Sequence, residues 1–432
     1  MEITLEGKEP RRGLLIAALT IALFFLYQSV RLWIADYRIN SDRLAEIESG
    51  AALEPGNGEA WDLLGRFRQL DFVAGDANEA VKDFQRAIRD NPLSAYYWMN
   101  LAGAYEATGD ISHARDAFEH AQAVYPLSAQ VDWNYGNFLL REQQWAEGYA
   151  QTRLAVRADP SLLPLAISRT WRSNHDVDTL LNQVLPADVN AYLRTLDFFA
   201  SIHEAEAGLA VWQRLMSLAK PIALPKSFSF LDELIREDRS ADASRVWREA
   251  LRAAGLPHED PGNGSLIWDG NFTGDFPNGG LGWRWNSPPG ASIDFDSAPP
   301  MQGGRSVRLD FGGGFNLELD HPLEYVPVEP NRTYHFRAYL RTAAIPTESG
   351  MRFAIADPNH AGMALLETEN LTGDHSWTAA EADVTTGAQT HFLAVRLYRS
   401  RSRLFDNRLS GTAWIADVSL VPTGADASGN QQ

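Results

Sequence analysis

The stretch YYWMNLAGAY, residues 96–105, places four aromatic rings in ten positions and carries no charge. Trp98, Leu101 and Tyr105 recur at steps of three and four residues, which is the spacing of one face of an α-helix. Ala102 on the same face is small enough to let a neighbouring helix approach closely. The pattern therefore predicts a helix whose rings pack in a core, and it does not predict a reactive site.

A fixed period extends this helix into a repeat. Pro92, Pro126 and Pro160 follow one another at intervals of 34 residues, and a period of this size indicates stacked structural repeats. Gly109 and Asp110 would end the first helix and turn the chain. The residues of the best-defined repeat alternate large and small side chains over two helices: Trp98, Leu101, Ala102, Tyr105, Ala114, Phe118 and Ala121.

These positions resemble the tetratricopeptide repeat, specifically over residues 59–160 and loosely over 161–254. The resemblance implies an all-α solenoid over residues 41–254, in which 41–53 form the second helix of a truncated first repeat. It also implies a scaffold that binds protein partners in a groove lined by the first helix of each pair.

Asparagines on the first helices of this family commonly bond an extended peptide. Asn100 and Asn134 lie 34 residues apart, and Asn137 follows one turn later. An amide both donates and accepts hydrogen bonds, which suits the recognition of a peptide backbone. The resemblance thus implies a peptide-binding groove at these three residues. The alternative is that they are solvated asparagines of the repeat pattern.

Residues 13–35, GLLIAALTIALFFLYQSVRLWIA, are long and apolar enough to cross a bilayer of roughly 30 Å as a helix. A cleaved signal peptide is the alternative, but Phe24–Tyr27 stand where a cleavage site needs small side chains. Lys8, Arg11 and Arg12 favour a cytoplasmic tail over residues 1–12, although arginines also follow the span. We expect a single-pass signal anchor in a bacterial inner membrane, with most of the chain periplasmic.

Composition limits the classes of function. A chain of 432 residues predicts several domains, and its net charge of −18 disfavours nucleic acid or an anionic lipid surface as the main partner. Contact with a lipid bilayer is expected through residues 13–35. Cysteine is absent, so disulfides, thiolate catalysis and cysteine-ligated zinc are excluded.

After a polar linker at 255–263, the period changes from three or four residues to two. Alternating apolar residues recur in short segments, such as Val307, Leu309 and Phe311, or Tyr334, Phe336, Ala338 and Leu340. Many such segments predict an antiparallel all-β sandwich over residues 264–422, followed by a disordered tail at 423–432. The expected fold class is thus multidomain: a transmembrane helix, an all-α solenoid and a β-sandwich.

Several phrases in this region resemble, in order, the carbohydrate-binding modules and other galactose-binding-like jelly rolls. They are WDGNF (268–272), GLGW (280–283), VEPNRTYHFRAYLRT (328–342), HSWTAAEADV (375–384) and AWIADVSLVP (413–422). Glycan binding requires aromatic faces and planar donors. The candidates are Trp283, Trp285, Trp377, Tyr339 and Tyr398, with Arg337, Arg352 and Arg396 on outward strand positions.

Each tryptophan has the alternative of a place in the core. If the three arginines share one sheet face, an acidic polysaccharide is a suitable ligand; they could equally dock against the acidic helical region. The resemblance also implies a structural calcium held by Asp417. Asn271 and Thr273 stand where the family often has an acidic residue, which departs from the oxygen-rich ligand set that calcium prefers.

No nucleophile elbow, phosphate loop, zinc-binding helix or dinucleotide fingerprint occurs in the sequence. Asp294 with Asp296, and Glu318 with Asp320, are the acidic pairs that glycoside hydrolysis would need, but alternation places each pair on one face of one strand. We therefore expect a non-enzymatic scaffold with no cofactor beyond the candidate calcium. It would bind protein partners through the helical groove and glycan through the sandwich, in exopolysaccharide assembly or export; the alternatives are a docking scaffold without sugar affinity and a glycan-active enzyme.

Overall fold

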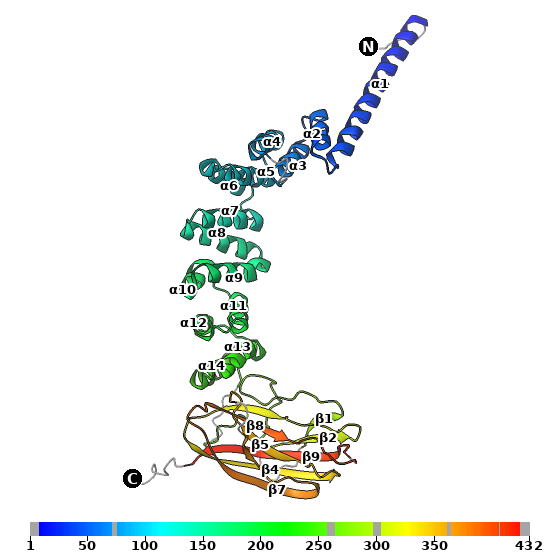
Figure 1. The fold of residues 1–432 in the computed structure, drawn as a ribbon. Helices are drawn as coiled ribbons and strands as arrows, with labels where there is room; N and C mark the ends of the chain where they lie inside the picture. Colours follow the sequence, from blue (N-terminus) through cyan, green and yellow to red (C-terminus); the bar gives the residue numbers. More distant parts are fainter. Residues whose placement is uncertain are drawn as a thin grey trace. The chain divides into compact units, whose positions relative to one another are not determined.

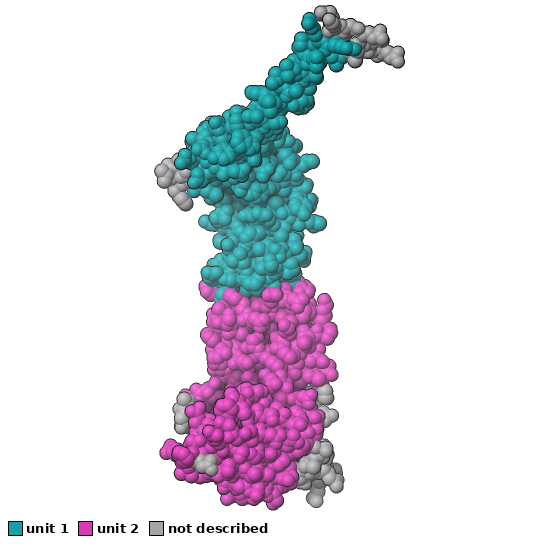
Figure 2. All heavy atoms as spheres, turned by 90° about the vertical axis from the view of Figure 1, so that its right-hand side faces the viewer, with its two compact units in different colours: residues 1–174, 178–186 teal, residues 175–177, 187–432 magenta. Residues whose placement is uncertain are grey.

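The computed structural model describes residues 8–70, 76–256, 264–296, 304–360, 364–405 and 407–423. The chain divides into two compact units, residues 1–174 with 178–186 and residues 175–177 with 187–432 (Figure 2). This boundary falls inside the expected helical region. Most of the linker expected at 255–263 and of the tails expected at 1–12 and 423–432 lies outside the described residues.

The first unit consists of helices that follow one another along the chain (Figure 1). They are α1 (Lys8–Ile39), α2 (Leu44–Leu53), α3 (Gly58–Leu70), α4 (Ala77–Asp90), α5 (Ala95–Ala107), α6 (Ile111–Val124), α7 (Ala129–Arg141), α8 (Trp145–Ala158), the short η1 (Pro160–Leu162), α9 (Leu163–Asn174), and the short α10 (Val177–Thr179) and η2 (Leu180–Val184), which reach the boundary between the units. The helix expected from YYWMNLAGAY is α5.

The tryptophan and the proline that mark the period are bonded to each other. Trp61 Nε1 donates to the carbonyl oxygen of Pro55 at 3.0 Å, and Trp98 Nε1 donates to that of Pro92 at 2.9 Å. Each indole thus ties the start of a first helix to the loop before it. The third repeat has Asp132 at this position, and Gln122 donates to its carboxylate instead.

Large and small side chains alternate in the core of the helix pairs, as the repeat pattern predicts. Phe84, Ala102 and Phe118 are buried, and a Cβ on Gly65 would lie 2.8 Å from the Phe84 ring. Trp98 and Tyr105 are only partly buried: they pack against this core and also line a pocket of about 560 Å³ beside α4. None of the four rings of α5 is fully buried and Tyr96 is 40% exposed, so the rings lie at the edge of the core and not inside it as predicted.

Helix α1 is long and apolar enough to cross a membrane. The last turns of α1 also take part in a helix–helix core, because Ala35 and Ile39 pack against Ile47 and Ala51 of α2. Gly50 lets the two helices approach, since a Cβ there would lie 2.9 Å from Ile39 Cγ1. The helix expected at 41–53 is thus α2, and the end of α1 is its partner.

The second unit begins with α11 (Val189–Ser201), α12 (Ala205–Ser217), η3 (Leu224–Ser227), α13 (Phe228–Arg236) and α14 (Ser240–Ala253). Trp212 and Trp247, which repeat at 35 residues in the sequence, are both buried here. A Cβ on Gly208 would lie 2.4 Å from Phe230, so α12 and α13 are in close contact.

Two antiparallel sheets complete the second unit, and their strand orders are β1-β2-β9-β4-β7 and β3-β8-β5-β6. The strands are β1 (Ala291–Asp296), β2 (Ser306–Gly312), β3 (Leu323–Pro327), β4 (Thr333–Ile345), β5 (Arg352–Ala356), β6 (Ala364–Glu367), β7 (Gly373–Thr385), β8 (Phe392–Tyr398) and β9 (Ser410–Pro422). The alternating apolar residues, such as Val307, Phe336 and Val395, form the shared core. The expected fold class is confirmed.

Candidate functional site

The first helices α3, α5, α7 and α9 carry a polar and aromatic face, which we call the first-helix face. Its contacts join each helix to the next. Asn100 Nδ2 on α5 donates to Asp62 Oδ1 on α3 at 2.7 Å, and the Arg66 guanidinium lies 5.6 Å from the centre of the Tyr96 ring. On the following helix, Arg141 holds Glu106 through two bonds of 2.5 and 2.7 Å.

Asp62 is the buried anion of this face. It is only 1% exposed, and burial raises the pKa of its carboxyl, while the bond from Asn100 and the charge of Arg66 act in the opposite direction. Arg66 Nε lies 3.0 Å from Asp62 Oδ2. Asn100 therefore has a structural role as a donor to Asp62, a residue that the repeat pattern does not mark.

The two other predicted asparagines also lie on this face and are also engaged. Asn134 Nδ2 donates to the Gln130 carbonyl oxygen at 2.8 Å, one turn earlier on α7. Asn137 Oδ1 accepts a bond from Arg169 of α9, whose guanidinium lies 5.2 Å from the centre of the Trp133 ring. In the described part of the chain, Asn100 Oδ1, Asn134 Oδ1 and Asn137 Nδ2 have no protein partner, so each amide keeps one polar atom available.

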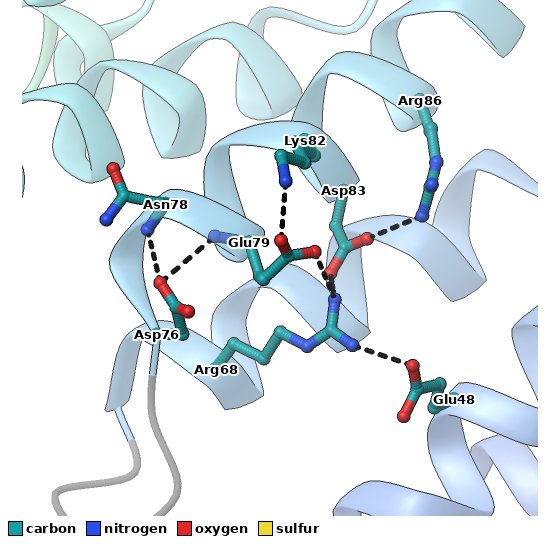
Figure 3. A network of polar contacts seen from close by, with 8 residues as sticks. All are labelled: Glu48, Arg68, Asp76, Asn78, Glu79, Lys82, Asp83 and Arg86. Carbon is teal, nitrogen blue, oxygen red and sulfur yellow. Dashed lines mark hydrogen bonds and ion pairs between the residues drawn. The ribbon is translucent and has the colours of Figure 1, made fainter.

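A second polar network lies between α2, α3 and α4 (Figure 3). Arg68 of α3 contacts Glu48 of α2 at 3.0 Å and the fully buried Asp83 of α4 at 2.5 Å, and Arg86 contacts the other oxygen of Asp83 at 3.1 Å. Burial raises the pKa of Asp83, and the two arginines counteract it. The buried charge is thus paired within the protein, which is a structural arrangement that ties three helices together.

The glycan candidates divide into separate groups. Tyr339 and Arg337 lie on β4, where they pair with Ala379 and Glu381 of β7. Trp377 is two residues before Ala379 on β7, so its side chain points to the same side of the sheet. This trio shares the outer face of the five-stranded sheet. Arg352, Arg396 and Tyr398 lie on β5 and β8 in the other sheet, where both guanidinium groups lie 5.5 Å from the centre of the Tyr398 ring.

The two remaining tryptophans are not on either face. Trp283 is 0% exposed and belongs to the core of the sandwich, with its ring 5.3 Å from that of Phe272. A sugar has no access to it, and the alternative of a core residue is the correct one for Trp283. Trp285 is half-buried and packs partly against the same core.

The outer face of the five-stranded sheet is acidic. Three arginines, Arg308, Arg337 and Arg341, stand there with six carboxylates: Asp294, Asp296, Asp310, Glu381, Asp383 and Asp417. Arg337 already pairs with Glu381 at 3.0 Å, and Arg352 on the other sheet pairs with Glu367 at 3.3 Å. Because the three predicted arginines do not share a face, the condition for an acidic polysaccharide is not met.

Asp417, the expected calcium ligand, lies close to a positive charge. It lies on β9 with a φ of 48°, and the charged side chain that acts on it is Arg337, a cation. Asp269, in the opening phrase, accepts bonds from Thr273 N and Gly274 N, and both of its carboxylate oxygens are used. Calcium prefers several oxygen ligands, and a calcium ion held by Asp417 stays a prediction.

One group in the described residues has metal-ligand geometry, and it is in the helical part of the second unit. The ligand atoms of His203, Glu233 and Glu237 lie within 4.8 Å of one another. Arg236 also bonds Glu233, which is fully buried, and His203 Nδ1 lies 3.1 Å from Glu233 Oε1. The buried carboxylate is therefore already paired with the guanidinium of Arg236.

Arginines also contact three of the four acids considered for catalysis, and Asp320 lies 2.7 Å from His321 Nδ1. Arg308 contacts Asp294 at 3.5 Å and Asp296 at 3.2 Å, so it occupies the space between these carboxylates. A glycosidic bond would have to lie in that space. Glu318 faces Arg401 at 3.6 Å.

Within the second unit, the sandwich packs against α13 and α14 through two glycines. A Cβ on Gly279 would lie 2.1 Å from the Phe228 ring, and one on Gly280 would lie 2.5 Å from Trp247 Cζ3. Gly280 also has a φ of 60°, which favours glycine. The GLGW phrase of the sequence is therefore part of this packing contact.

Polar contacts also join the sandwich to α13, and the sandwich holds a buried acid. Arg284 contacts Asp232 of α13 at 2.5 Å, so an arginine outside the predicted set makes the dock to the helices. Asn359 Nδ2 donates to the Ile235 carbonyl oxygen at 2.7 Å. Glu324 of β3 is fully buried, accepts a bond from Trp268 N at 2.6 Å, and burial raises its pKa well above the ordinary value of 4.5.

Comparison with known proteins adds little to this description. No family model matches the chain, and no curated protein matches it. Among solved structures, the crystal structure of MamA is similar to 40% of this chain and 85% of its own chain, with 13% sequence identity and a TM-score of 0.26. The fold therefore rests on the helix pairs and the two sheets themselves.

Proposed function

We propose that this protein is a membrane-anchored, non-enzymatic scaffold that binds protein partners on its first-helix face. The observation that carries the proposal is the run of successive first helices whose polar and aromatic side chains form one connected surface. Asn100, Asn134 and Asn137 each keep one polar amide atom available there, which suits an extended peptide backbone.

Anchoring is part of the proposal. Helix α1 provides the length and composition of a single membrane span, and Lys8, Arg11 and Arg12 before it favour a cytoplasmic amino terminus. The remainder of the chain would then lie in the periplasm of a bacterium, where exopolysaccharide assembly or export is the setting we propose. Because the chain has no cysteine, single cysteines placed on either side of α1 can report the orientation through a membrane-impermeant maleimide.

Photocrosslinking from defined positions tests whether partners bind the first-helix face. A photoreactive residue at Tyr96 or Trp133 on the first-helix face should capture the same protein in living cells. The matched control is Asp116, which is exposed on the second helix α6. Equal capture from Asp116 would refute a partner site on the first-helix face.

Glycan binding by the sandwich is the second candidate role, and it is confined to Tyr339, Trp377 and Arg337. These three share the outer face of the five-stranded sheet, and the acidic character of that face favours a neutral glycan. The full chain in detergent, applied to an array of neutral and acidic glycans, should lose retention with Tyr339→Ala and Trp377→Ala. The exposed Trp145 of α8 supplies the control substitution Trp145→Ala.

Failure of the full chain to retain any glycan would leave a sandwich whose role is docking, as its contact with α13 and α14 already illustrates. The same array of glycans tests whether the protein has catalytic activity. Release of shortened glycans would refute the non-enzymatic role, which is supported by the position of Arg308 between Asp294 and Asp296.

A further inference from the structure

The irregular segment before β1, residues 266–285, carries contacts that join the sandwich to α13 and α14, and we call it the strap. Gly279 and Gly280 of the strap approach aromatic rings of both helices, and its Arg284 pairs with α13. The Trp268 ring of the strap lies 5.7 Å from the Trp247 ring of α14, edge to face. The strap therefore links the sandwich to both helices.

Backbone hydrogen bonds attach the strap to the sheets at separated points. Val418 N of β9 donates to the Gly270 carbonyl oxygen at 3.0 Å, and Arg284 exchanges two bonds of 2.8 and 3.1 Å with Leu323 of β3. No residue of the strap belongs to a strand. A segment held in this way opens at a lower free energy than the interior of a sheet, so the strap is the part of the sandwich that can open locally.

Glu324 of β3 places a carboxyl group against the strap. It alternates with Val326, a core residue, so its side chain points into the sandwich. Glu324 is 1% exposed, and its Oε1 accepts the bond of 2.6 Å from the backbone nitrogen of Trp268. Among the described residues, Glu324 Oε2 has no hydrogen-bond partner. The carboxyl group is thus buried, and it holds the strap at the residue whose ring contacts α14.

The surroundings of Glu324 do not stabilise a negative charge. The charge that acts on it is that of Asp269, another acid, and its partner across β8 is the apolar Val395. The Arg284 guanidinium lies 4.9 Å from the centre of the Tyr325 ring, on the opposite side of β3. Burial is the main cause that raises the pKa of Glu324 well above its ordinary value, and Asp269 acts in the same direction.

We propose that the protonated Glu324 side chain keeps the strap closed, and that loss of its proton to water opens the strap and loosens the packing of the sandwich on α13 and α14. A buried carboxylate without a counterion is costly, and opening of the strap hydrates it. The pKa of Glu324 is ordinary in the open form and raised in the closed form. Closure is therefore strongest below pH 4.5 and weakens as pH rises toward the raised value. Neither the first-helix face nor glycan binding enters this switch.

Hydrogen exchange of the full chain in detergent, measured at a series of pH values from 4.5 upward, tests the proposal. After correction for the intrinsic effect of pH on exchange, the strap, α13 and α14 should exchange faster as pH rises. The increase should reach at most about tenfold per pH unit, because one proton is released on opening. Strands β4 and β9 in the middle of the five-stranded sheet should show no such increase.

Variants at one position show whether Glu324 is the group that titrates. Glu324→Gln keeps the shape and the acceptor for Trp268 N, and Glu324→Met replaces the carboxyl group by an apolar side chain of similar size. Both should abolish the pH dependence, and a folding defect in one leaves the other to decide. The matched control is Glu318→Gln, because Glu318 is an exposed glutamate of the same sandwich, and it should leave the pH dependence unchanged. At about pH 5.5, the infrared difference between the unaltered chain and Glu324→Gln should contain the absorption of a protonated carboxyl group.

Exchange in the strap that does not change with pH in the unaltered chain would overturn the proposal. The same pH dependence in Glu324→Gln or Glu324→Met would overturn it as well, since another group would then be responsible. An equal increase over all strands of the sandwich would show that the strap does not open by itself, and that result would also contradict the proposal.

Discussion

Three glycine substitutions test whether the sandwich is packed on α13 and α14. Gly279→Ala adds a methyl group 2.1 Å from Phe228 without a backbone penalty, since only Gly280 of the pair has positive φ. Gly255→Ala imposes backbone strain alone, because Gly255 has a φ of 71° and nothing within 4 Å of the added carbon. Gly280→Ala combines both effects, with φ 60° and Trp247 at 2.5 Å.

The magnitudes follow from these geometries. The left-handed backbone costs an alanine about 1–2 kcal/mol, which is the whole effect expected for Gly255→Ala. Overpacking typically costs about 1–3 kcal/mol, which is the effect expected for Gly279→Ala. Gly280→Ala should therefore lower the free energy of unfolding by about 2–5 kcal/mol if the two effects add.

Denaturant unfolding and hydrogen exchange supply the assay. The loss should be accompanied by faster exchange in α13 and α14 for Gly279→Ala and Gly280→Ala, and by no change there beyond the helix end for Gly255→Ala. If all three variants lost the same stability, and exchange in the two helices stayed unchanged, the packing contact would not exist in solution.

Three further predictions concern buried groups. The pKa of Glu324 is higher in the folded than in the unfolded chain, so stability should fall as pH rises from its ordinary value of 4.5 toward the raised value, by at most about 1.4 kcal/mol per pH unit; Glu324→Gln should remove this slope in pH-dependent melting. Asp83→Ala leaves Arg68 without its buried partner and should cost roughly 3 kcal/mol in denaturant unfolding, whereas the exposed Lys82→Ala should cost less than about 1 kcal/mol. Phe118→Ala opens a core cavity and should cost about 3–5 kcal/mol by the same measurement; a loss below about 1 kcal/mol would contradict its core position.

The helical fold could be predicted because its information is local and repeated. Trp61 and Pro55 have the same separation in sequence as Trp98 and Pro92, and both pairs are hydrogen-bonded in the structure. The outward direction of the sandwich arginines was equally local, since alternation decides it. The sheet that each strand joins could not be predicted locally, because the pairing of β5 with β8 and of β4 with β9 is decided by residues far apart in the chain.

The candidate sites were less predictable for related reasons. Trp283 precedes the first strand in an irregular segment, where no alternation separates core from surface. Asn100 was recognised by its period, but its partner Asp62 lies 38 residues away and on another helix.

Hydrogen exchange of the full chain with and without its captured protein partner tests the central claim most directly. If the helices form a scaffold with one binding face, protection should appear in α3, α5 and α7 while α4, α6 and α8 exchange as before. Protection confined to the second helices, or spread equally over both, would contradict the account.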